Sequence, residues 1–418
     1  MIQLRNPHAE GMRSHVVLAA TVTATAVAAG VNVMPIFLAD SLIREMNWSE
    51  PTLFAGISIG MILSALAAPV SFYLISRFGL RTVMVGALVT LLLGLLGSAV
   101  ADSAATLALV WIVSAAAGGC LSPMVIGAVV TSRYYPHHCG ATSSLYFSAA
   151  LLGPSLALPL TLLITAPVRW HALVIAASAV AAVLVGVMAL IPKHASFPRT
   201  RNHEFTRVAG IGAMAKNPNF WLLLFMTIVC GVTSSGLVDN HLVSLCRSQG
   251  LPPQTGASAV AFSALAALLG GLIFGICADR FTGLWLLASY FLGRSILLIW
   301  LPKTSLSFEE LAQFSILYGL DWAATMPALM RVAVRSFGAQ GIAPVMSILA
   351  LAHHASGAAT TFLVSVAGPQ FYASGFIAGG VLCLITAFLL VATSPLIRTG
   401  EGLSLRFSLQ GGQMRKSQ

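Results

Sequence analysis

The chain has 418 residues, of which 57% are hydrophobic and 8% charged, and its formal net charge is +10. A soluble domain carries about a quarter charged residues, so this composition excludes an ordinary water-soluble protein. The charges lie between long apolar runs, which indicates contact with membrane lipid and argues against nucleic acid. The six cysteines form no CxxC pair, so neither a disulfide framework nor a zinc site is expected.

In chain order, the sequence predicts an all-α membrane protein, because an apolar run of about 20 residues crosses a bilayer as a helix. The first run begins near Val16 and is too long for the apolar core of a signal peptide, so it is predicted to be the first span. Twelve spans are predicted: residues 16–39, 52–75, 82–101, 104–132, 140–165, 169–192, 219–246, 255–278, 283–301, 308–336, 342–366 and 371–395.

The charge of the loops predicts how these spans are oriented. If the N-terminus is cytoplasmic, most of the 22 Lys and Arg residues fall on the cytoplasmic side. We therefore expect both termini in the cytoplasm and the protein in the cell membrane, which is the inner membrane in a bacterium. The long polar interval 193–217 is predicted to be a cytoplasmic linker between two six-helix bundles, residues 1–192 and 218–418.

A short basic turn appears twice, about half a chain length apart. The first copy is residues 76–81 (SRFGLR) and the second is residues 279–284 (DRFTGL). Such a repeat in a multi-span protein predicts two related bundles whose rocking gives alternating access to a central site.

These turns resemble the Gly-x-x-x-Asp-Arg-x-Gly loops of the major facilitator superfamily. Gly275, Asp279 and Arg280 fit that pattern, with Gly283 one residue late, whereas Ser76 replaces the acid in the first copy. The resemblance implies a latch on the cytoplasmic side that biases one access state. The residues assigned to it are Arg77, Arg81, Arg133, Gly275, Asp279 and Arg280. For Arg133, a favourable charge at a helix C-terminus is the alternative interpretation.

Further motifs are similar to the monocarboxylate and oxalate–formate-like branch of that superfamily. They are Asn47-Trp48-Ser49, Gly118-Gly119, Pro123, residues 132–136, His241-Leu242 and Ala352-His353-His354. The resemblance implies a small carboxylate as substrate. One departure weakens that implication, because span 255–278 lacks the basic residue that such carriers hold there.

Ionisable residues inside the membrane are candidates for function, because each costs at least about 2.5–3.5 kcal/mol to insert. Counting along the helices at 1.5 Å per residue places Asp321, His353 and His354 near the midplane. We expect Asp321 to pair with one of the histidines and to carry a proton or orient the substrate. The alternative is a helix–helix hydrogen bond without a transport role. Adjacent histidines point about 100° apart, so one is expected to face the cavity.

Neutral polar groups in the spans complete the candidate substrate site. Asn32, Tyr146 and Tyr318 are expected to orient a small ligand, with helix packing as the alternative. No third ligand accompanies the histidines, so no metal site is expected.

Two positions are predicted to lie at the outer boundary of the membrane. Asp239 and His241 are expected there as an outer gate or as a solvated helix end. Arg294, on a peripheral helix, is expected to extend its side chain to the outer surface.

The chain carries no P-loop and no G-x-S-x-G motif, so neither an ATP-driven pump nor an enzyme is expected, and no cofactor is expected. The sequence therefore predicts a secondary transporter that moves a small organic solute, a carboxylate in the first instance, coupled to protons. A drug or metabolite efflux carrier is the alternative. From another class, a membrane sensor with a transporter fold is also considered.

Overall fold

The computed structural model describes residues 7–38, 48–101, 103–135, 138–164, 170–190, 214–280 and 283–414. Every regular element in these ranges is a helix. The first part of the chain forms α1 (Pro7–Phe37), α3 (Glu50–Phe78), α4 (Leu80–Ala99), α5 (Ala104–Cys120), α6 (Pro123–Tyr134), α7 (Cys139–Ile164) and α8 (Trp170–Leu190).

One predicted span in this part is broken. The rod expected over 104–132 consists of α5 and α6, with Leu121 and Ser122 between them. Pro123 starts α6 and explains the break, because proline has no backbone N–H and its ring clashes with the preceding helical turn.

The second part of the chain begins with a rod of irregular winding, in which α10 (Pro218–Gly231), the π-helix η3 (Val232–Val238) and α11 (Asp239–Ser248) continue one another. The elements that follow are α12 (Pro253–Arg280), α13 (Gly283–Trp300), the 3-10 turn η4 (Leu301–Lys303), α14 (Phe308–Ala367), the 3-10 turn η5 (Pro369–Phe371) and α15 (Tyr372–Met414).

The long element α14 is two rods joined at a sharp corner. Gly338 has φ 69° and ψ 172°, a left-handed backbone that glycine adopts without strain. With α5 and α6 counted together as one broken rod and α14 as two, the described ranges contain twelve rods, as the sequence predicts. Among the described residues, eight helices are long and apolar enough to cross a membrane.

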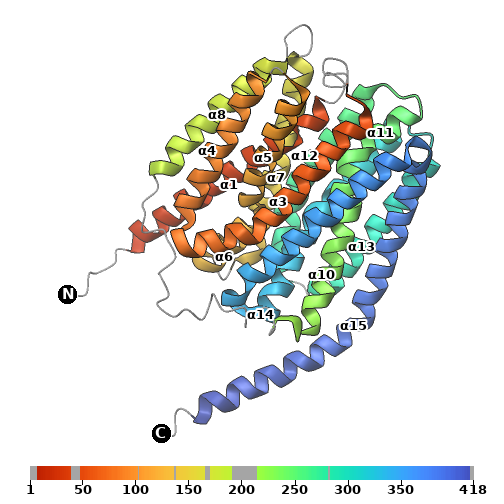
Figure 1. The fold of residues 1–418 in the computed structure, drawn as a ribbon. Coiled ribbons are helices and arrows are strands. Elements are labelled where there is room, and N and C mark those ends of the chain that lie inside the picture. The colour runs from red at the N-terminus through yellow and green to blue at the C-terminus, as the bar shows by residue number, and fades with distance from the viewer. Residues whose placement is uncertain are drawn as a thin grey trace.

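The last rod is longer than its apolar span. The span Pro369–Thr393 agrees with the predicted 371–395, and α15 continues beyond it as a helix to Met414 that projects from the bundle (Figure 1). Most of the predicted linker, residues 193–213, lies outside the described residues.

The rods lie side by side in one elongated bundle, and α1 begins at the same end of it at which α15 finishes (Figure 1). We call the end at which α1 begins the terminal end, and the end at which α1 finishes the distal end. The bundle surface carries exposed large apolar side chains such as Leu93, Leu190 and Phe388, as expected for a surface that contacts lipid.

Small residues let the rods approach closely where they cross. A side chain at Gly153 of α7 would overlap the Ala26 carbonyl of α1, and one at Gly119 of α5 would overlap the Ser64 backbone of α3. Close approach at small residues is the usual way in which helices associate in lipid. Contacts between the first six rods and the last six are made by α3 with α14, by α7 with α12 and α14, and by α6 with α14.

Candidate functional site

A cavity of about 240 Å³ lies between the first six rods and the last six. We call it the central cavity. Its lining residues come from α1, α3, α5, α6 and α7 on one side and from η3, α11, α12 and α14 on the other. On α1 they fall between Thr25 and Ile36, so the cavity lies toward the distal end.

The cavity is closed toward the terminal end. There α6 packs against α14, and every residue from Met124 to Thr131 is buried. Met326 of α14, only 1% exposed, lines the cavity together with Met124.

Asp239 brings a carboxylate to the wall of this cavity. It begins α11, directly after the π-helix. Asp239 is exposed, whereas its chain neighbours Val238 and Asn240 are buried. Among the lining residues that the structure describes, Asp239 is the one acidic residue, and none is Lys or Arg. The sequence placed Asp239 at the outer membrane boundary; the structure places it on the cavity wall, which His354 and Asn32 also line.

The π-helix η3 positions Asp239. A π-helical turn is wider than an α-turn and recurs at functional sites. The Asn240 amide holds the segment to α14, because its Nδ2 donates to the Ser235 carbonyl at 2.7 Å and lies 2.7 Å from Thr361 Oγ1. Asp239 is thus fixed at the junction of two windings.

The adjacent histidines of α14 have different surroundings. His353 is buried, with Nε2 3.1 Å from Ser235 Oγ of the π-helix. His354 is half-buried and borders the central cavity as well as a second cavity described below. Their rings meet edge to face at 5.3 Å. His354 is therefore the better placed of the two to contact a solute.

Asp321 pairs with an arginine and with neither histidine, contrary to the sequence-based expectation. Its Oδ2 accepts from Arg294 Nε at 2.7 Å, and the two side chains are 9% and 1% exposed. Asp321 is absent from the described lining of the central cavity. This geometry matches the alternative interpretation, a link between two helices.

The prediction that Arg294 extends to the outer surface is wrong. Its guanidinium points into the last six rods, where it also donates to Cys230 Sγ (3.3 Å), Ser234 Oγ (3.3 Å) and Thr325 Oγ1 (3.0 Å). It lies 5.5 Å from the centroid of the Phe291 ring and 5.7 Å from that of Tyr318. This set of side chains around Arg294 and Asp321 is called the arginine cluster below. It ties the π-helix to α13 and α14.

The three neutral candidates differ in their access to the cavity. Asn32 borders both cavities, and Gly118 provides the space that its amide occupies. Tyr318 lines the central cavity and stacks on Phe314 at 5.3 Å. Tyr146 is fully buried; its hydroxyl lies 2.6 Å from Thr21 Oγ1 and joins α7 to α1.

Several polar atoms around the central cavity lack a protein partner. Among the described residues they include Asn32 Oδ1, Ser122 Oγ, Ser263 Oγ and Trp322 Nε1, all buried. Buried polar atoms are nearly always hydrogen-bonded, so these atoms require water or a bound solute.

His241, the second outer-gate candidate, is fully buried near the distal end. Its Nε2 lies 3.1 Å from the Thr361 carbonyl, and its ring lies between Phe54 of α3 (4.9 Å) and Tyr372 of α15 (5.5 Å). The structure therefore shows a packed contact between the first and last six rods and no solvated helix end at this position.

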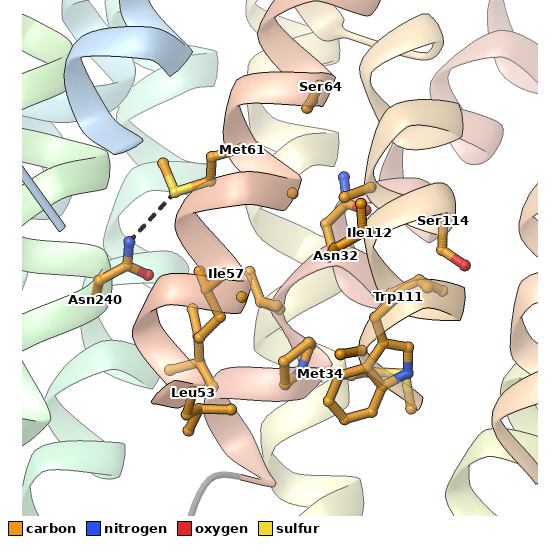
Figure 2. A pocket seen from close by; sticks show the side chains of 18 of the residues that line it. Asn32, Met34, Leu53, Ile57, Met61, Ser64, Trp111, Ile112, Ser114 and Asn240 are labelled. Carbon is orange, nitrogen blue, oxygen red and sulfur yellow. Dashed lines mark hydrogen bonds between the residues drawn. The ribbon is translucent and has the colours of Figure 1, made fainter. Parts of the chain in front are cut away.

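A second cavity, of about 180 Å³, lies next to the central cavity and is lined mainly by α1, α3 and α5. We call it the side pocket. Figure 2 shows Leu53, Ile57 and Met61 along α3, with Met34 and Trp111 opposite them. Asn240 contacts α3, because its Nδ2 lies 3.6 Å from the Met61 sulfur. The sequence analysis did not identify this pocket.

The latch candidates are only partly described. Arg77 donates to the Tyr73 hydroxyl at 3.0 Å, and Arg81 donates to the Ala189 carbonyl in the last turn of α8. The Arg133 guanidinium lies over the neighbouring Tyr134 ring, 5.5 Å from its centroid. The backbones of Gly275, Asp279 and Arg280 belong to α12, but their side chains lie outside the described residues.

Comparisons with known proteins agree with this architecture. The family model of the Major Facilitator Superfamily matches residues 17–361. Among solved structures, the proton:xylose symporter XylE bound to 6-bromo-6-deoxy-D-glucose is similar, with TM-score 0.73 and 12% identity over 92% of this chain and 96% of that chain. The human organic anion transporter MFSD10 is also similar, with TM-score 0.71 and 15% identity over 92% of this chain and all of that one. A search of curated protein sequences finds no match.

At these identities the solved structures show the fold alone. The family match covers far more than half of the chain, and the family consists of multi-pass membrane transporters, not of enzymes. The chain therefore belongs to the Major Facilitator Superfamily and is a secondary transporter.

Proposed function

We propose that the protein carries a small organic solute through the central cavity by alternating access, coupled to protons. One observation carries the proposal: the cavity between the first and last six rods holds a carboxylate and an imidazole, Asp239 and His354, beside buried polar atoms that have no protein partner. Closure at the terminal end by α6 and α14 corresponds to one of the two access states.

We assign proton coupling to Asp239. A carboxylate exposed in a cavity inside a membrane protein can exchange protons with water, yet an unpaired charge there is costly while the cavity is closed. Loading a proton or a solute removes that cost. Arg294 acts on Asp239 through space, but it is already paired with Asp321. We assign Asp321 a positioning role, because the arginine cluster holds Ser234 within η3.

The cavity bears on the choice between the two predicted solute classes. The resemblance to the monocarboxylate-like branch implies a carboxylate, and MFSD10 is described as an organic anion transporter. A carboxylate about 4 Å from an ionised Asp239 would be repelled by about 4 kcal/mol at an effective dielectric constant near 20. No described lining residue is a Lys or Arg that would offset this. The geometry therefore supports the second class, a drug or metabolite carrier.

Proteoliposomes with an imposed pH gradient test this function. A panel of labelled carboxylates, amines and neutral solutes is supplied outside, and a pH-sensitive dye inside reports proton movement. We expect at least one solute to accumulate only with the gradient. Asp239→Asn should abolish that accumulation while exchange without a gradient persists.

The matched control is Glu309→Gln, which removes an exposed carboxylate at the start of α14 and should leave accumulation unchanged. Accumulation by Asp239→Asn with unchanged pH dependence would place the coupling group elsewhere. A folded protein that moves none of the panel while binding one of its members would support the sensor alternative.

A further inference from the structure

The central cavity and the side pocket are adjacent, because seven residues line both of them. Five of these shared residues are polar and mark the junction of the two cavities: Asn32 of α1, Ser64 of α3, Ser235 and Asp239 of the π-helical rod, and His354 of α14. A solute anchored at this junction can extend into either cavity.

The side pocket is mostly apolar beyond this junction. Its wall includes Met34, Leu53, Ile57, Trp111, Ile112 and Val174, with Ser114 and Asn240 as polar residues among them. A methyl group added at Gly56, which lines the pocket, would meet nothing within 4 Å, so the space reaches the α3 backbone. A concave apolar space with a few polar groups at one end is typical of a site for a small organic ligand.

The charge at the junction is that of Asp239. The titratable groups around it are otherwise committed: Arg294 is bound to Asp321, and His353 Nε2 lies against Ser235 Oγ. Cys230 Sγ accepts from Arg294 at 3.3 Å. His354 borders the junction beside its neighbour's ring. Asp239 has no described protein hydrogen-bond donor and is exposed to the cavity, so a ligand can supply the missing donor.

We propose that the site takes an amphipathic organic cation, with an ammonium group at Asp239 and an aromatic or branched apolar body in the side pocket against Trp111. Charge-assisted hydrogen bonds between an ammonium and a carboxylate are about twice as strong as neutral ones. Burial of the apolar body adds affinity in proportion to the area removed from water. This proposal rests on the proposed transport function and specifies its substrate class.

Calorimetric titration of the purified protein in detergent tests the assignment without requiring transport. Three probes share one body and differ only in the head group: 4-phenylbutylamine, 4-phenylbutanol and 4-phenylbutanoic acid. A fourth, n-butylamine, keeps the ammonium and lacks the ring. We expect the amine to bind about tenfold or more tighter than the alcohol, and the acid to bind weakest. Removing the ring should weaken binding by a comparable factor.

Two variants separate the head-group contact from the body contact. Asp239→Asn should remove the preference for amine over alcohol while leaving alcohol binding unchanged. Trp111→Ala should weaken the amine and the alcohol alike. Trp221→Ala, at a 56% exposed tryptophan on α10 away from both cavities, is the control and should bind like the unmodified protein.

The proposal is overturned if the acid binds as tightly as the amine, if no probe binds, or if the preference for amine survives in Asp239→Asn. It is also overturned if Trp111→Ala changes binding no more than Trp221→Ala does. Should a variant fail to fold, the four probes on the unmodified protein decide alone. Amine binding without gradient-driven flux would refute the transport proposal and leave this one standing; flux of carboxylates alone would do the reverse.

Discussion

Replacing Arg294 with methionine removes the centre of the arginine cluster. Methionine retains an apolar stem but loses the ion pair with Asp321 and the hydrogen bonds to Cys230, Ser234 and Thr325. The Asp321 carboxylate would then lack a described partner inside the bundle. Breaking a buried ion pair in this way costs about 3–5 kcal/mol. Against a typical stability of about 5–15 kcal/mol, that loss is large.

Two companion variants make the magnitude specific. Asp321→Asn should cost less, about 1–3 kcal/mol, because an asparagine oxygen can still accept from Arg294 Nε and the other contacts of the guanidinium remain. The double variant Arg294→Met/Asp321→Leu removes both charges. Replacing a buried pair with apolar residues is often neutral, so the double variant should recover at least about 2 kcal/mol relative to Arg294→Met alone.

Thermal unfolding of the purified proteins, followed by tryptophan fluorescence and size-exclusion chromatography, measures this order. The control is Arg335→Met, at an exposed arginine of α14, which should lie within about 0.5 kcal/mol of the unmodified protein. If Arg294→Met unfolds like this control, or if the double variant is no more stable than Arg294→Met, the reasoning about the buried pair is refuted.

Three further outcomes follow from the contacts described. Gly153→Ala should destabilise the protein by about 1–3 kcal/mol, because the new methyl group would overlap the α1 backbone. Gly56→Ala is the control, because its methyl group meets open space and should leave thermal unfolding unchanged. Equal melting temperatures for the two variants would contradict this reasoning. Asn240→Leu removes the hydrogen bonds to Ser235 and Thr361 and should cost about 1–2 kcal/mol of stability. Hydrogen exchange followed by mass spectrometry should show faster amide exchange in η3. Unaltered exchange would show that the Asn240 amide does not hold this segment. His241→Phe keeps the ring packing and should cost about 1 kcal/mol with flux retained, so a folded variant without solute flux would identify His241 as a gating group.

The rods were predictable because lipid imposes one requirement on each of them, a long apolar segment with internal backbone hydrogen bonds. Hydropathy could not predict the end of α15, since a backbone can remain helical to Met414 after its apolar composition ends near residue 395. Nor does hydropathy distinguish one rod from two shorter helices, as in α5 and α6, although Pro123 carries that information.

The candidate site was less predictable, because the sequence gives depth along a helix but not the direction in which a side chain points. Arg294 was placed correctly along its helix, yet it points inward to Asp321, which hydropathy cannot indicate. Asp239 was counted as part of a straight helix and assigned to the membrane boundary. In the structure a π-helix precedes Asp239, and the central cavity extends toward the distal end. Asp239 therefore lies on the cavity wall. Both features depend on packing between distant segments.

The π-helical segment makes the charge of the cavity depend on how the backbone is wound. Residues that follow it are rotated about the helix axis relative to an unbroken α-helix, where each residue turns by about 100°. Rewinding residues 232–238 as an α-helix without any change of sequence would turn α11 by about that angle and carry Asp239 off the wall. Deleting Val232 removes the extra residue that the wider turns accommodate, so the deleted chain can wind as an α-helix with α11 in its present orientation. Such a protein should still fold and should still bind 4-phenylbutylamine better than 4-phenylbutanol. Loss of the preference for the amine would show that the wide turns themselves place the charge on the wall. A change of winding in the intact chain would therefore remove the negative charge from the cavity during the transport cycle.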